Sequence, residues 1–366
     1  MLIKIFQLLT LAALGFYATD SSAQIFRLTL TPDGTLPAPL VTALQAEVQK
    51  IEDEINDGLP SAATPDRLME GMANSSVMAG KGIGSDYASN MSVFLIGAGV
   101  GVGADLEKNK EADSPISGAG VQGGLIIGTN LSWLPVNNIL GLEAKKLNVY
   151  FNGMKYKYEM NNKDTSGSAD LSSYGVHFSY DWIKSRGNRL LGWGGVKIHT
   201  GYEYNHTNLK VNSAITKDLS YEDGGVTYTS QISASPAAEI DVATHSIPLE
   251  ISTSVQVLYF VSLYTGLGVD YNIGKATGKG DLNSSTSNLC AGDTDTSTPA
   301  CDGGLGDVGD IDTEANVDGK GKVNPFLTRG FAGVQLNLPW TRIFVQADKA
   351  FGNDLVGVST GLRFAF

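Results

Sequence analysis

Eleven charged or imidazole side chains occur singly among small residues, in segments where polar and apolar residues alternate. Their signs are mixed, and charged groups on a confined wall must be paired or hydrated. The pattern predicts either an internal network of ion pairs or a constriction that selects solutes by charge. The candidate network consists of Lys146, His177, Asp181, Lys197, His199, Glu203, Glu250, Asp270, Arg329, Asp348 and Arg363.

Acid–base catalysis is another chemistry that some of these residues could perform. His177, Asp181 and His199 fall on neighbouring predicted strands, so a base and an orienting carboxylate could meet there. However, the chain has only 4 histidines, which is few for a catalytic site of this kind. We therefore expect no enzymatic activity, no catalytic residues and no cofactor.

A loose acidic group could bind calcium. Asp307, Asp310 and Asp312 are interspersed with glycine, but they do not follow the spacing of an EF-hand loop. The sequence thus predicts no defined metal site. A solvated loop and a weak calcium site both remain open for this segment.

The elements that carry the candidate residues are predicted strands, because apolar residues recur at every second position. In 246–258, for example, Ile247, Leu249 and Ile251 alternate with Glu250 and Ser252. An apolar outer face and a small, polar inner face are typical of a transmembrane barrel. A water-soluble sandwich would instead carry a densely charged solvent face. The predicted strands are 91–104, 117–131, 142–158, 171–182, 192–204, 246–258, 261–273, 325–338, 342–351 and 355–366.

The fold expected is therefore all-β, a closed antiparallel up-and-down transmembrane barrel of about ten strands. Twelve strands are the alternative, if the partly alternating segment 208–235 supplies two more. The connections alternate between long and short, and outer barrels keep their short turns in the periplasm. The two longest, about 205–245 and 274–324, are predicted as extracellular loops. An even strand number predicts that both chain ends are periplasmic.

The last strand carries a motif. Leu362, Phe364 and Phe366 alternate up to an aromatic carboxy-terminal residue. This run resembles the C-terminal signal of Gram-negative outer-membrane β-barrel proteins. The resemblance implies an outer-membrane location, contact with outer-membrane lipid, and recognition of these three residues by the barrel-assembly machinery.

The N-terminal part differs from the barrel. Residues 1–23 have a cationic start, an apolar stretch and small residues before Gln24, as in a secretory signal peptide. Residues 24–89 predict a helical head, with one helix over 39–59 and a second that begins at Thr64-Pro65. This head could plug the lumen or lie in the periplasm against the barrel mouth. The barrel then occupies 90–366.

Composition limits the partners. The net charge is −12 and no basic stripe is present, which argues against nucleic-acid binding. The chain contains 44 glycines in 366 residues, far above the usual proportion of about 7%.

The two cysteines, Cys290 and Cys301, predict a disulfide in an exported protein, with two free thiols as the alternative.

Ten strands enclose a narrow lumen, because barrel diameter grows with strand number. The sequence therefore predicts a narrow or gated channel or transporter for small solutes, with the helical head as plug. The alternative is a closed structural or surface-interaction barrel whose acidic loops contact partners. The sequence indicates neither the solute nor the oligomeric state.

Overall fold

The computed structural model describes residues 29–30, 42, 45–46, 49–50, 64–88, 93–106, 116–163, 165–187, 190–223, 226–258, 260–293 and 311–366. The predicted signal peptide and Cys301 lie outside these residues. For Cys290 only the backbone is described, in strand β12. The disulfide therefore stays a prediction, as does calcium binding, since Asp307 and Asp310 also lie outside.

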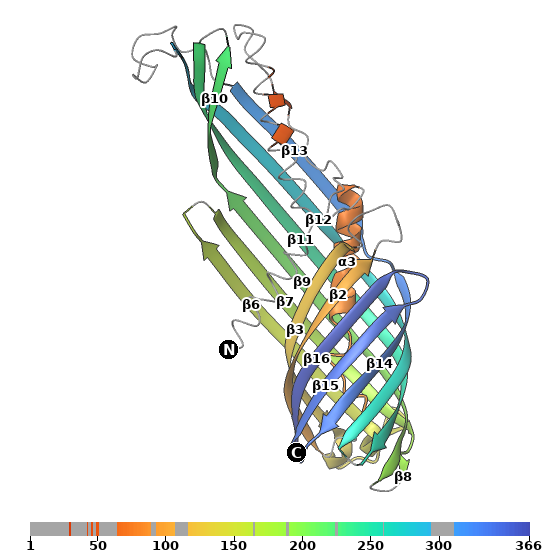
Figure 1. Cartoon of the computed structure of the whole chain (residues 1–366). Helices are drawn as coiled ribbons and strands as arrows, with labels where there is room; N and C mark the ends of the chain where they lie inside the picture. Colours follow the sequence, from red (N-terminus) through yellow and green to blue (C-terminus); the bar gives the residue numbers. More distant parts are fainter. Residues whose placement is uncertain are drawn as a thin grey trace.

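Among the described residues, ten strands form a closed antiparallel ring (Figure 1). Each pairs with its neighbours in sequence order, and the pairing of β16 with β2 completes the ring. The predicted barrel fold is thus confirmed. The strands are β2 (Phe94–Leu106), β3 (Ile116–Asn130), β6 (Leu147–Asn161), β7 (Thr165–Ile183), β9 (Leu191–Ser213), β11 (Val226–Val257), β12 (Val261–Asp293), β14 (Phe326–Asn337), β15 (Thr341–Ala350) and β16 (Leu355–Ala365).

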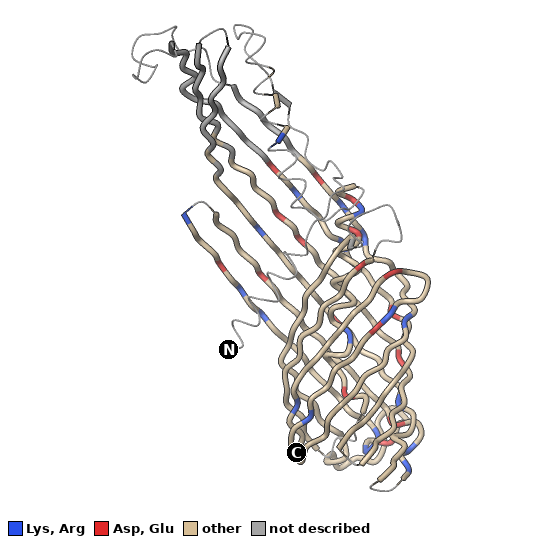
Figure 2. Tube along the Cα trace, in the orientation of Figure 1, with Lys and Arg blue, Asp and Glu red and all other residues tan. Residues whose placement is uncertain are grey.

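The two faces of the wall have opposite character, as the alternation predicts. On β11, Leu249 is 59% exposed while its neighbour Glu250 is 5% exposed. Apolar side chains point outward and polar ones inward, which is the reverse of a water-soluble protein and suits a wall in lipid. In Figure 2 most of the barrel trace is tan, with few charged residues. Leu362, Phe364 and Phe366 at the chain end are also exposed.

Several strands continue far beyond the ring, as Figure 1 shows. The segments predicted as loops, 205–245 and 274–324, are instead mostly strand where they are described. They extend β9, β11 and β12 and add β10 (Ile215–Asp223) and β13 (Ile311–Lys322). Their sequence hides this, because both faces are polar. The backbone N–H and C=O groups of these segments are nevertheless paired between neighbouring strands, as where Glu239 of β11 lies opposite Lys279 of β12.

The hairpin of β10 and β11 lies in this extension and adds no strand to the ring, so the ring holds ten strands, not twelve. A short strand, β1 (Thr29–Leu30), pairs with β13 in the same region. At the other end of the barrel lie β4 (Asn138–Ile139), β5 (Leu142–Glu143), β8 (Arg186–Gly187) and the 3₁₀ turns η1 (Leu131–Trp133) and η2 (Ala144–Lys146).

Helix α3 (Pro65–Ala79) begins where the sequence predicts. The Thr64 hydroxyl accepts a hydrogen bond from the Arg67 amide at 3.2 Å, and Pro65 occupies the first turn. The helix is largely buried between β2, β3 and β16 on one side and β11, β12 and β13 on the other. It therefore lies within the mouth of the barrel. Of the first predicted helix, Thr42, Gln45, Ala46, Gln49 and Lys50 are helical and exposed, and its other residues lie outside the described set.

Helix α3 and the C-terminus lie at opposite ends of the barrel (Figure 1). The Arg67 guanidinium contacts Asp105, near the end of β2, at 3.1 Å. The Phe366 amide instead donates to the Phe94 carbonyl, at the start of β2, at 2.9 Å. These two points are about 36 Å apart along the strand. Helix α3 thus lies at the end of the barrel opposite the C-terminus, in agreement with a head inside the lumen, and the periplasmic location of the head and C-terminus stays a prediction.

Candidate functional site

The centre of the candidate site is Arg329, which is fully buried on β14. Its guanidinium donates to Asp270 at 2.8 Å and to Asp348 at 2.6 Å, and also to Glu250. These carboxylates come from β12, β15 and β11, so one cation joins four strands of the wall. A guanidinium has five donors in a fixed plane, which suits several carboxylates at once.

The segment 80–88, which follows α3, continues into the lumen and contacts this network. The Lys81 ammonium group donates to Glu203 at 2.8 Å and to Ser246 at 2.9 Å, and it lies 3.4 Å from Asp270. Its side chain is completely buried. Lys81 therefore ties the segment to β9, β11 and β12.

Asp86 makes the opposite contact with a basic part of the wall. Its carboxylate accepts a hydrogen bond from Arg342 on β15 at 2.8 Å and lies 3.9 Å from Arg363 on β16. Arg363 also donates to the backbone carbonyls of Gly82 and Ile83, at 3.1 and 3.3 Å. Two wall arginines thus hold one short stretch of the luminal chain.

Tyr87 adds a hydrogen bond and aromatic packing to the contacts of Lys81 and Asp86. Its hydroxyl donates to Glu250 at 2.8 Å. Its ring packs against Phe331 and His199, with centroids 4.8 and 4.7 Å away, and stacks on Tyr264 at 5.6 Å. An aromatic layer therefore fills the lumen around the ion pairs.

The luminal chain and the wall are complementary in charge. The acidic part of the wall carries Glu203 and the three carboxylates that bind Arg329, and there the chain presents Lys81. The basic part carries Arg342 and Arg363, and there the chain presents Asp86. A buried charge is costly unless it is paired, so this match stabilises the segment in its observed position.

Glycines on the wall allow α3 to approach the backbone closely. A Cβ atom at Gly103 of β2 would lie 2.2 Å from the Ser75 carbonyl oxygen. One at Gly71 of the helix would lie 2.4 Å from the Ser117 carbonyl oxygen. No side chain fits at these positions without moving the helix.

The remaining predicted residues do not form a catalytic group. His177 lies 3.1 Å from the Asn152 amide oxygen, and His199 lies 2.9 Å from the Ser252 hydroxyl. Asp181 pairs with Lys197 at 3.6 Å. Each of the three residues considered for catalysis thus contacts a different partner.

Lys146 was placed on the wall by the sequence pattern, but it lies in the turn η2, before β6 begins. The predicted strand starts too early because residues 144–146 form a 3₁₀ turn. There Lys146 and Lys145 both pair with Glu143. The hydrogen bond from Lys146, with a second from Lys145, holds the pKa of Glu143 below its usual value.

Lys81, Asp86 and Tyr87 are functional candidates that the sequence patterns did not identify. They lie in Gly80-Lys81-Gly82-Ile83-Gly84-Ser85-Asp86-Tyr87, which has neither helical nor strand periodicity. One signal was available: a glycine-rich stretch with one cation, one anion and one phenol directly before the first strand. Such a stretch has enough polar groups to bind a polar wall and few bulky side chains.

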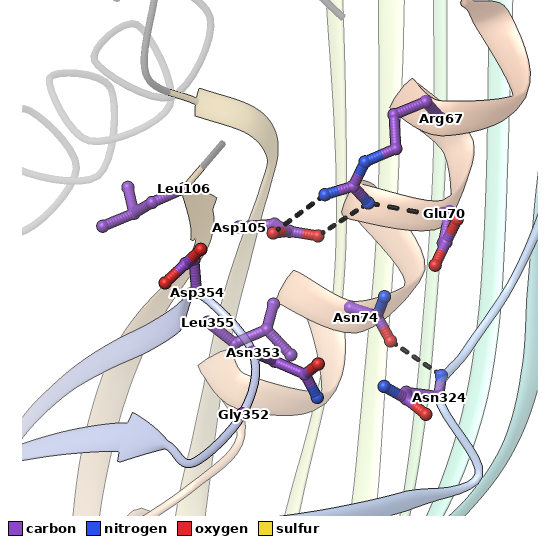
Figure 3. Close-up of a pocket in the computed structure, with 10 residues that line it drawn as sticks. All are labelled: Arg67, Glu70, Asn74, Asp105, Leu106, Asn324, Gly352, Asn353, Asp354 and Leu355. Carbon is purple, nitrogen blue, oxygen red and sulfur yellow. Dashed lines mark hydrogen bonds and ion pairs between the residues drawn. The ribbon is translucent and has the colours of Figure 1, made fainter. Parts of the chain in front are cut away.

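Two cavities of about 440 Å³ each adjoin the luminal chain. The first lies between α3 and the ends of β2 and β16, as Figure 3 shows, and has Arg67, Glu70, Asp105 and Asp354 on its wall. There Asn74 accepts a hydrogen bond from the Asn324 amide at 2.7 Å. The second lies at the C-terminal end, next to Ala88, Arg186, Trp193 and Arg342.

Within the described ranges, no group of three or more histidine, cysteine, aspartate or glutamate residues is arranged to hold a metal ion. No helix in the described part of the chain is long and apolar enough to cross a membrane.

The chain belongs to the Lsa36-like family, whose model matches residues 22–366. No curated protein matches the sequence. Among solved structures, the transport unit of the autotransporter AIDA-I from Escherichia coli is similar at 11% identity, with 80% of this chain and 96% of that chain covered and a TM-score of 0.32. The translocator domain of the autotransporter NalP from Neisseria meningitidis is similar at 10% identity, with coverage of 91% and 100% and a TM-score of 0.27. The CymD monoaromatic hydrocarbon channel follows at 9% identity, with coverage of 81% and 98% and a TM-score of 0.25.

Proposed function

We propose that this Lsa36-like protein is an outer-membrane barrel whose lumen is closed by residues 65–88, here called the plug, and that it conducts small polar solutes when the plug moves. The observation that carries this proposal is the pairing of Lys81 with the acidic wall and of Asp86 with the basic wall. The short turns and the C-terminus would face the periplasm. Outer-membrane lipid would surround the apolar band, and the barrel-assembly machinery would bind the last strand.

The contacts of residues 80–88 are suited to reversible displacement. Besides the apolar packing of Ile83, Tyr87 and Ala88, they include ion pairs and hydrogen bonds, which water that enters from the two cavities can replace. An apolar plug of the same size would expose its surface to water on leaving, at a cost of about 25 cal/mol per Å². The wall that remains is polar and can be hydrated.

The wall behind the plug would present charges of both signs. Glu203, Glu250 and Asp270 stand on β9, β11 and β12, while Arg342 and Arg363 stand on β15 and β16. Rings of one sign select ions of the other sign. A mixed wall instead favours small polar or zwitterionic solutes, and we propose these as the permeating class. We propose no enzymatic role.

Conductance in planar lipid bilayers tests the proposal. Three proteins are compared: the mature chain, a variant that lacks the chain up to Ala88, and the double variant Lys81→Gln/Asp86→Asn. We expect rare openings for the first, steady conductance for the second and frequent openings for the third. Lys145→Gln is the matched control, since its side chain is 64% exposed and lies outside the lumen.

The alternative is a closed barrel that displays a surface for interaction. The continuation of β9, β11, β12 and β13 beyond the ring favours it, because a polar sheet of this length is not needed to span a membrane. A plug-less variant that folds into a barrel and remains silent in the bilayer would exclude conduction and favour this alternative.

A further inference from the structure

We infer that the barrel carries its own N-terminal segment across the membrane, so that the residues before the plug stand on the face opposite the C-terminus. The substrate of this activity is a polypeptide, namely the part of this chain that precedes the plug. The inference concerns the path of the chain and does not depend on conduction of solutes.

The contacts of the plug follow one direction through the barrel. Arg67 and Asn74 contact Asp105 and Asn324 at the mouth. Further along the chain, the carbonyls of Gly82 and Ile83 bind Arg363. Asp86 then binds Arg342, the second residue of β15.

Contacts of Ala88 and Val93 show where the chain leaves the lumen at the other end of the barrel. Ala88 borders the cavity formed by the turns of the C-terminal end, together with Pro339. The Val93 amide then donates to the carbonyl of Phe366 at 3.0 Å, directly before β2 begins. Pro65 and Val93 thus lie at opposite ends of the barrel, and the described residues 65–88 occupy the lumen between them.

A second, independent contact fixes the chain before the plug on the same face as α3. Thr29 and Leu30 pair with Glu314 and Thr313 of β13. Lys322 of the same strand lies opposite Lys275, close to the mouth. Glu314 is about 26 Å farther along the strand, so Thr29 lies well beyond the ring.

The width of the lumen limits how the segment can pass. Tyr87 and the ion pairs of Lys81 and Asp86 fill the space around residues 80–88. This stretch contains Gly80, Gly82 and Gly84, and added Cβ atoms at these positions would lie 2.1–2.5 Å from wall side chains. The lumen therefore holds one chain segment here and leaves no room for a second, so the chain passes this point once.

The long strand extensions identify the outer face, because outer-membrane barrels have short periplasmic turns and tall extracellular parts. The described residues from Thr29 to Lys50 are then outside the cell, and α3 lies at the outer mouth of the barrel. Assembly begins in the periplasm, so these residues must pass through the barrel as it forms. The N-terminal segment thus passes through the barrel first, and residues 80–88 then remain in the lumen.

Single-cysteine labelling tests this topology in a Cys290→Ser/Cys301→Ser background. Gln45→Cys is the probe, with Ala46→Cys as a second probe, since both residues are exposed. Lys157→Cys on the strand extension marks the outer face, and Leu140→Cys, whose native residue is 99% exposed, marks the C-terminal end. A membrane-impermeant maleimide is applied to intact cells and to cells with a permeabilised outer membrane.

We expect Gln45→Cys to label in intact cells together with Lys157→Cys, while Leu140→Cys labels only after permeabilisation. The inference holds if both probes label in intact cells together with Lys157→Cys, and it is overturned if Lys157→Cys and the probes label only after permeabilisation, because the segment would then be periplasmic. It is overturned if either probe follows Leu140→Cys or stays unlabelled in both preparations. A silent bilayer would not change this result, so failure of the channel proposal is distinguishable.

Discussion

The substitution Lys81→Met removes the only cation that the plug presents to the acidic wall. The side chain of Lys81 is fully buried, and Glu203 and Asp270 lie within 3.4 Å of its ammonium group. Removing one partner of a buried ion pair costs about 3–5 kcal/mol. Asp270 keeps its contact with Arg329, and water from the adjoining cavities can hydrate Glu203, so we expect the lower value.

A change of about 3 kcal/mol corresponds to roughly a 140-fold shift in an equilibrium. The equilibrium here is between the seated and the displaced plug. Residues 80–88 report it, because they are buried in the lumen while the plug is seated. Hydrogen exchange of a peptide that covers residues 80–88 should therefore accelerate by roughly two orders of magnitude in Lys81→Met.

Two comparisons make the test specific. Lys145→Met removes an exposed lysine outside the lumen and should leave this exchange rate unchanged within about threefold. The double variant Lys81→Met/Glu203→Gln lacks the unpaired carboxylate. We therefore expect its seated plug to be about 0.5–3 kcal/mol more stable than the sum of the two single-variant effects would give. Equal exchange in Lys81→Met and Lys145→Met, or strict additivity of the double variant, would refute the electrostatic account of the plug.

Three further predictions concern other parts of the molecule. Arg329→Met leaves three buried carboxylates without their shared cation, so we expect the barrel to lose at least about 3 kcal/mol of stability; Gln335→Met, also buried and on the same strand, is the control in denaturant titrations. Gly103→Ala should displace α3 and speed its hydrogen exchange. Gly124→Ala should not, because the atom nearest to its added Cβ would be 3.7 Å away. Equal exchange of α3 in both variants would show that the close approach is dispensable. Under non-reducing conditions the mature protein should be lighter than the reduced chain by two hydrogens, as a Cys290–Cys301 disulfide requires, and two thiols that react with alkylating reagent would contradict it.

The wall of the barrel was predictable because lipid on one side and a polar lumen on the other impose a period of two. Ile247, Leu249 and Ile251 reveal that period, and Arg363 stands opposite Gly97 of β2, as the closing strand requires. The strand extensions were not predictable in this way. Beyond the ring both faces of the sheet are polar, so pairs such as Lys210 with Glu239 leave no alternation of hydrophobicity.

Within the site, the sequence indicates which wall residues face inward, but not which of them meet. The position of Arg329 among carboxylates from three other strands depends on the register of the closed ring, which no single strand determines. Lys81 and Asp86 have no periodic context at all. An even strand number places the start of the first strand and the end of the last strand on the same side of the barrel. It does not determine the path of the chain before the first strand.

Arg363 has a consequence for the order of assembly. It lies on β16, whose pairing with β2 closes the ring, and the same side chain binds the carbonyls of Gly82 and Ile83. The final zipper of the barrel therefore includes a guanidinium that is satisfied only when the luminal chain is in place. Closure and occupancy are therefore coupled at this residue: a ring that closes empty leaves the guanidinium at its own seam without these two carbonyls, and only water in the lumen can solvate it.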